Sequence, residues 1–197
     1  MVAVQLGLRS EELFALRRND VRPGVLVIDE AIVGGEVKST KTEESDGEMP
    51  LTPNLQTELD HYLETSVGEA GDSWLFPSSR TAVPMLPENF LKRILKPAAI
   101  RAKVASATKK TKTKTGELIT TSNITWQSLR RTSATLFGSK AKDPKLTQSH
   151  MRHSDPTTTL KKYQKAIPAE ARAAALAVEV ELYAAIKKVA QRTPKSA

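Results

Sequence analysis

The chain contains no cysteine, which excludes disulfide bonds, thiolate metal sites and cysteine nucleophiles. Aromatic residues make up only 5% of its 197 residues, and no apolar run approaches the roughly twenty residues that a membrane-spanning helix needs. Residues 1–8 have neither a basic stretch nor a long apolar one, so a secretory signal is not expected. We therefore expect no membrane segment and a cytoplasmic protein.

Positive charge is missing from one segment and concentrated in another. Residues 43–79 contain no lysine or arginine, although the net charge of the whole chain is +8. Residues 92–115 contain no acidic residue and carry nine basic ones: Lys92, Arg93, Lys96, Arg101, Lys103, Lys109, Lys110, Lys112 and Lys114. Such a run is often only a solvated basic face, but it also suits contact with a polyanion such as DNA.

The patterns favour one mainly helical α+β domain, because this length suits a single core. Helices are expected over residues 10–17, 53–65, 86–104 with a break at Pro97, 127–137, 144–150 and 169–190, and another one beginning at Asp155-Pro156. Residues 25–51 are expected to form a small antiparallel meander, and residues 105–123 a hairpin around Gly116.

The last predicted helix has a broad apolar face, which requires a partner surface. That surface belongs either to the same domain or to a neighbouring protomer. We therefore divide the chain into a domain at residues 1–168 and a C-terminal helix and tail at residues 169–197, with packing in trans left open.

Five dispersed residues offer chemistry for a phosphate: Arg9, Lys41, Arg130, His153 and Tyr163. Forked guanidinium groups can donate two parallel hydrogen bonds to phosphate oxygens, and a phenol can act as a nucleophile. Taken singly, each residue has an ordinary interpretation. An isolated arginine is more often an ion-pair partner, a hairpin lysine is often solvated, and a helical tyrosine often packs.

Other residues compete with these candidates or could combine with them. Lys38 lies close enough to Lys41 in the sequence to compete for the hairpin role, while Tyr62 and Tyr183 are the comparison tyrosines. His150 is three residues before His153, a spacing that metal sites use, but no acidic or histidine companion completes a ligand set. Neither a metal nor another cofactor is expected.

Four segments resemble the conserved boxes of tyrosine recombinases of the phage-integrase type, in the family's order. Residues 7–13, GLRSEEL, are similar to its first arginine box, and residues 40–42 and 49–51, TKT and MPL, to its β-hairpin lysine region. Residues 128–132, SLRRT, resemble its H-x-L-R-H-T box. Residues 151–163, from MRHS to LKKY, resemble its final L-G-H…Y box, so the resemblance extends from residue 7 to about 168.

The resemblance implies an integrase-like catalytic domain, the DNA breaking-rejoining enzyme fold, with a small three-stranded antiparallel sheet. It implies site-specific recombination of double-stranded DNA by a prokaryotic or phage-encoded enzyme, working as a dimer or tetramer on DNA without ATP. Tyr163 would form the 3′-phosphotyrosyl intermediate, and Lys41 would protonate the leaving 5′-oxygen. Arg9, Arg130 and His153 would bind the phosphate, Glu12 would orient the arginines or cap its helix, and Arg131 would add to the DNA-binding residues.

The chain departs from the family's pattern at two places. Gln127 stands where histidine is usual, three residues before Arg130, and glutamine does not exchange a proton. The family's N-terminal helix and core-binding domain are not apparent before residue 7. These departures favour one alternative, a remnant that binds DNA without efficient cleavage. A second alternative keeps the chemistry and changes the task, to a type IB topoisomerase-like or transposon recombinase activity.

Overall fold

The computed structural model describes residues 1–39, 47–78, 83–103, 107–112, 118–141, 143–152 and 169–192. At residues 107–112, 118–121, 144, 170 and 189–192 it describes the backbone alone. The helices are α1 (Val2–Gln5), α2 (Ser10–Leu13), α3 (Pro53–Ser66), α4 (Pro87–Phe90), α5 (Lys96–Arg101), α6 (Trp126–Ala141), α7 (Pro144–His150) and α8 (Ala169–Arg192). A 3-10 turn, η1 (Arg18–Asp20), and a π-helical turn, η2 (Leu91–Leu95), complete the helical segments described.

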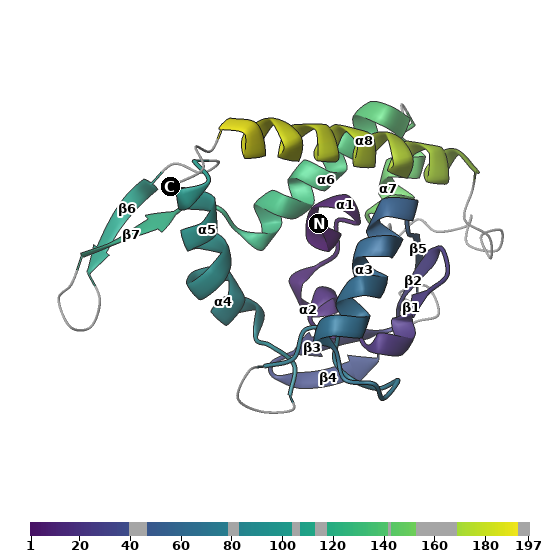
Figure 1. Ribbon diagram of the computed structural model, residues 1–197, viewed down its shortest axis with the longest axis horizontal. Coiled ribbons are helices and arrows are strands. Elements are labelled where there is room, and N and C mark those ends of the chain that lie inside the picture. Colours follow the sequence, from purple (N-terminus) through teal and green to yellow (C-terminus); the bar gives the residue numbers. More distant parts are fainter. Residues whose placement is uncertain are drawn as a thin grey trace.

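The strands form one three-stranded antiparallel sheet and two hairpins. The sheet has the order β1 (Val21–Arg22), β2 (Val25–Ile28) and β5 (Gly47–Pro50). The hairpins are formed by β3 (Glu30–Val33) with β4 (Glu36–Ser39), and by β6 (Ala107–Lys112) with β7 (Leu118–Ser122). The mainly helical α+β class and the small three-stranded sheet are therefore confirmed. Figure 1 shows β6 and β7 extending away from the helices.

The predicted meander over residues 25–51 is only partly right. Leu26 and Ile28 of β2 are buried, and Leu26 pairs with Met49 of β5 in the sheet. Asp29 then separates β2 from β3, so residues 25–33 form two strands instead of one. Because β3 pairs only with β4, the β3–β4 hairpin stands outside the sheet.

Two predicted helices have different bounds in the structure. The helix expected over residues 10–17 ends at Leu13, because Phe14, Ala15 and Leu16 are all buried, and a surface helix would expose part of such a run. Instead the Leu16 carbonyl accepts a hydrogen bond of 2.8 Å from the Leu75 amide.

The second difference lies in the helix expected over residues 86–104. It is divided by η2 immediately before α5, where Pro97 has no N–H to donate to the preceding turn. Ile94 of η2 is 46% exposed, so its apolar side chain is not part of the core.

Phe14 is the centre of the main core and fixes the segment that carries Arg9. Its ring contacts Phe76, Phe90 and Trp126 at centroid distances of 5.8, 5.6 and 5.4 Å. These partners come from the loop after α3, from α4 and from the start of α6. The aromatic contacts therefore hold the α2 segment against both flanking regions of the fold.

Helix α8 packs on the body of its own chain. Ala174, Ala175 and Val178 cover Phe137 of α6, and Figure 1 shows α8 lying across α6 and α7. The buried carboxylate of Glu179 accepts hydrogen bonds at the start of α3, from the Asn54 side chain at 3.0 Å and the Leu55 amide at 3.2 Å. A carboxylate is favoured at a helix N-terminus, so this contact anchors α8. Packing on a neighbouring protomer stays a prediction.

His150 ends α7 inside the molecule. Its ring is 6% exposed and stacks on Phe137, with 3.8 Å between the ring centroids and 6° between the planes. Burial lowers the pKa of His150 to about 4, Arg130 acts in the same direction, and a backbone hydrogen bond with Gln5 opposes the shift. The imidazole is therefore neutral in the folded chain at neutral pH.

This burial predicts a loss of stability in acid. The unfolded histidine titrates near 6.5, so between pH 4 and 6.5 the unfolded chain binds the additional proton. The contribution of neutral His150 is complete above pH 6.5 and falls by roughly 3 kcal/mol as the pH approaches 4. Urea denaturation should show the stability advantage of the wild type over His150→Gln shrinking between pH 7 and 4.5.

The pH dependence of the wild type alone would not isolate His150, because Asp20 changes the stability in the opposite direction over the same pH range. Burial raises the pKa of Asp20 to about 6, so its contribution decreases as the pH rises through the same window. His61→Gln, at an exposed position, is the matched control and should follow the wild type. If the free energy of unfolding of the wild type exceeded that of His150→Gln by the same amount at pH 7 and at pH 4.5, the burial of a neutral imidazole would be contradicted.

Candidate functional site

Gly7 lets three distant segments meet. It lies in the turn between α1 and α2 with φ +65°, in the left-handed region that favours glycine. A Cβ atom at this position would lie 2.7 Å from Ser133 Oγ of α6 and 3.1 Å from Met151 Sδ. The glycine of the GLR motif is therefore required by its backbone conformation and by the close packing around it.

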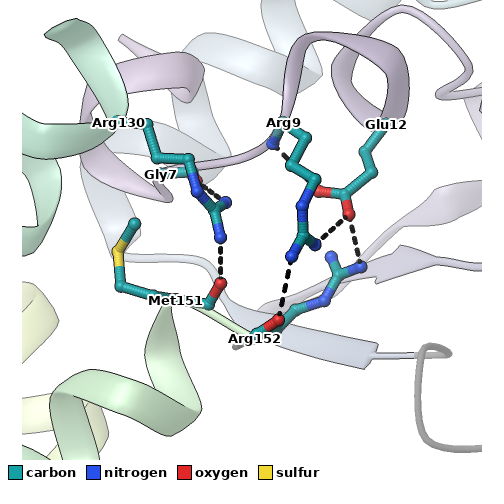
Figure 2. Close-up of polar contacts among 6 residues, drawn as sticks. All are labelled: Gly7, Arg9, Glu12, Arg130, Met151 and Arg152. Carbon is teal, nitrogen blue, oxygen red and sulfur yellow. Dashed lines mark hydrogen bonds and ion pairs between the residues drawn. The ribbon is translucent and has the colours of Figure 1, made fainter. Parts of the chain in front are cut away.

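Arg130 joins these segments through its guanidinium. The side chain lies on α6, is largely buried, and donates hydrogen bonds to the carbonyl oxygens of Gly7 and Met151 (Figure 2). Burial lowers the pKa of Arg130 and the nearby charge of Arg9 adds to this effect, but a guanidinium keeps its proton at neutral pH.

Arg9 is held beside Arg130 by Glu12. Its backbone amide donates to Glu12 Oε2 at 2.9 Å, and its Nη1 donates to Glu12 Oε1 at 2.8 Å. Glu12 thus caps the N-terminus of α2 and orients the arginine, which are the two roles expected from the sequence. The Arg9 side chain is 44% exposed, whereas that of Glu12 is 5% exposed.

Arg152 is a third guanidinium in the cluster, and the sequence analysis did not select it. Its Nη2 lies 3.1 Å from Glu12 Oε1, and its carbonyl accepts a hydrogen bond of 3.4 Å from Arg9 Nη2. The backbone of Arg152 is left-handed, with φ +50°. The family's L-G-H pattern has glycine at this position. That difference was the feature of the sequence that could have indicated an unusual backbone at Arg152.

The cluster carries an excess of positive charge. Burial raises the pKa of Glu12, but Arg152 and Arg9 outweigh burial and hold that pKa below its usual value. With Glu12 ionised and three arginines protonated, the four side chains sum to two positive charges. This arrangement suits an anion with several acceptor oxygens, such as a phosphodiester.

The predicted catalytic set consists of the five phosphate-directed residues and Gln127, and the structure brings two of these six together. Arg9 and Arg130 share the cluster, and Gln127 lies one turn before Arg130 on α6 with its side chain exposed. Lys41, His153 and Tyr163 lie outside the described residues. Their roles stay predictions.

The predicted DNA-contacting residues are distributed over η2, α5 and the turn after it, the β6–β7 hairpin and α6. The exposed ones are Lys92, Arg93, Arg101, Lys103 and Arg131; Lys96 is half-buried. Lys92 forms an exposed ion pair with Glu88 at 3.0 Å. Lys109, Lys110 and Lys112 belong to β6, where only the backbone is described, and Lys114 lies outside the described residues.

The described part of the chain contains neither a candidate metal site nor a candidate membrane span. There, no group of three or more histidine and acidic residues is arranged to hold a metal ion. Among the helices of that part, none is both long and apolar enough to cross a membrane.

Known structures share this fold. The integrase of transposon Tn1549 bound to circular-intermediate DNA matches with TM-scores of 0.58 and 0.57 at 20% and 21% identity, over 92% of this chain and 57% and 58% of the integrase chains. A complex of that integrase with transposon right-end DNA gives a TM-score of 0.55 at 20% identity, over 93% of this chain and 57% of the other. This chain thus spans less than two thirds of the integrase chains it resembles. No curated protein sequence matches it.

The chain has the fold of these integrase chains, and its arginine cluster lies where the first box, α6 and the end of α7 meet. Residues 1–170 match the Phage integrase family, and the chain belongs to this family.

The role of Gly7 leads to a paired prediction. Gly34 has the same φ of +65°, but a Cβ there would meet nothing within 4 Å, so Gly34→Ala isolates the backbone cost of about 1 kcal/mol. Gly7→Ala adds a clash with Ser133 and should lose at least 2 kcal/mol more. Equal losses in the free energy of unfolding for both variants would show that the three segments do not pack closely at Gly7.

Proposed function

We propose that this chain cleaves and rejoins duplex DNA as a site-specific tyrosine recombinase. One observation carries the proposal: Arg9 and Arg130, from separate parts of the sequence, lie together beside Glu12 with an excess of positive charge. A phosphodiester under attack gathers negative charge on its nonbridging oxygens, and preorganised guanidinium groups stabilise that charge. Arg9 supplies exposed donors, and Arg130 supplies donors from the floor of the site.

The strand-cleavage step assigns the remaining residues. The phenolate oxygen of Tyr163 forms a bond to phosphorus, the bond from phosphorus to the 5′-oxygen breaks, and Lys41 donates a proton to that oxygen. His153, the residue that follows Arg152 in the chain, hydrogen-bonds the phosphate. A 5′-hydroxyl of another strand then attacks the 3′-phosphotyrosyl bond and releases the phenol, so the bond energy is kept and no ATP is consumed.

DNA would lie over the basic surface of α4 to α6 and the β6–β7 hairpin. Lys92, Arg93, Arg101, Lys103 and Arg131 are exposed there and would neutralise backbone phosphates without reading sequence. We place the enzyme in the cytoplasm and expect its dimers or tetramers to form on the DNA. The fold match to transposon integrase chains bound to DNA supports DNA as the partner.

The covalent intermediate gives the first test. A nicked suicide substrate loses its short leaving strand, so an active enzyme should accumulate an SDS-resistant protein–DNA adduct. Tyr163→Phe should abolish the adduct, because phenylalanine has no nucleophilic oxygen. Tyr62→Phe and Tyr183→Phe are the controls and should keep it.

Two other outcomes separate the alternatives. DNA binding with no adduct under any condition would identify a binding remnant. Relaxation of supercoiled plasmid that lacks a defined site would identify a topoisomerase-like activity instead of site-specific recombination.

Gln127 gives the second test. The phenol of an unperturbed tyrosine, with a pKa of about 10, is ionised in about one molecule in a thousand at pH 7, and glutamine does not accept its proton. Gln127→His should therefore speed adduct formation by at least about tenfold at neutral pH. Gln148→His, at an exposed position of α7, is the matched control and should leave the rate unchanged.

If Gln127→His leaves the rate of adduct formation at the wild-type value, proton transfer at residue 127 does not limit cleavage. The exposed Gln127 side chain makes this comparison straightforward, since a histidine fits at an exposed helical position without repacking a core.

A further inference from the structure

Arg152 adopts a conformation that side chains rarely take. Its φ of +50° lies in the left-handed region, which costs a residue with a Cβ atom about 1 kcal/mol. Glycine would avoid that cost, and glycine is what the family's L-G-H pattern has. An arginine retained there is expected to contribute something through its side chain.

The Arg152 guanidinium shares one carboxylate oxygen with Arg9. Arg152 Nη2 and Arg9 Nη1 lie 3.1 and 2.8 Å from the same atom, Glu12 Oε1 (Figure 2). The two arginines differ in exposure, since the side chain of Arg152 is 11% exposed and that of Arg9 is 44% exposed. Arg9 is therefore the one that can meet a phosphate at the surface.

A shared carboxylate changes what Arg9 is able to do. Glu12 is almost fully buried, and a buried carboxylate that loses its counter-ion is strongly destabilised. If Arg9 were the only cation paired with Glu12, that penalty would hold Arg9 in place. With Arg152 already paired to the same oxygen, Arg9 can turn its donors toward DNA while Glu12 keeps a cationic partner.

We propose that Arg152 is a positioning residue that retains Glu12 and so releases Arg9 to the scissile phosphate. This inference rests on the proposed function for its phosphate. It assigns Arg152 no direct contact with DNA.

The packing around Arg152 supports this assignment. A Cβ atom at Gly47, the first residue of β5, would lie 2.9 Å from Arg152 Nε and 3.0 Å from its Cδ. The strand therefore passes directly over the side chain and covers it. Gly47 leaves the space in which Arg152 reaches Glu12.

The test compares duplex DNA affinity by fluorescence anisotropy for variants of the full chain. Arg152→Gly should weaken binding by roughly tenfold, because Arg9 then stays with Glu12 and loses a charge-assisted contact. Glycine suits the left-handed backbone, so the variant should fold. Arg22→Ala removes one exposed positive charge elsewhere and is the matched control for a general charge effect.

Two double variants separate positioning from direct contact. Glu12→Gln removes the buried charge, so Arg152→Gly should have little further effect on affinity in that background. In an Arg9→Ala background, Arg152→Gly should likewise cause no further loss of affinity. Additive losses in both backgrounds would make Arg152 a phosphate ligand in its own right and overturn the proposal.

Gly47→Ala is a second way to disturb Arg152 without changing any charge. It should weaken binding in the same direction, and in a Glu12→Gln background it should likewise have little further effect on affinity. If the wild type binds DNA and Arg152→Gly binds equally well, this inference fails alone. If the wild type itself binds no duplex DNA, the proposed function fails and the inference fails with it.

Discussion

One buried guanidinium holds the two halves of the site together. Arg130 donates to the carbonyl of Gly7, the first residue of the first box, and to the carbonyl of Met151, the first residue of the last box. The carbonyl of Gly7 can be reached because its left-handed turn and missing Cβ allow contact with Ser133 of α6. If this fork were lost, the relation of Arg9 to Arg152 would rest on their shared Glu12 carboxylate and on the hydrogen bond from Arg9 to the Arg152 carbonyl.

The net positive charge of the arginine cluster follows from the way the fold places Glu12. Phe14 and its aromatic neighbours fix the α2 segment, Glu12 then presents one carboxylate oxygen, and two arginines from distant segments converge on it. Because Glu12 stays ionised, the cluster is both stable without DNA and still positive enough to bind a phosphate. Preorganisation of this kind lowers the reorganisation needed when charge develops in a reaction.

The sequence predicted what depends on local pattern. Proline and capping signals located α3 and α7, and motif order predicted that Arg9 and Arg130 would meet. It did not predict what depends on tertiary packing. Helix α2 ends early because the residues after Leu13 are buried on all sides, and Arg152 joins Glu12 only through a turn that brings residues 140 positions apart into contact.

The measurement that tests the central claim most directly is the unfolding free energy of Arg130→Lys against Arg131→Lys. The two residues are neighbours on α6, but Arg130 is buried and bridges two carbonyls whereas Arg131 is exposed. An ammonium does not reproduce the planar fork, so Arg130→Lys should lose about 2–4 kcal/mol while Arg131→Lys loses almost nothing. Equal stability of the two variants would contradict a buried fork that holds the site together.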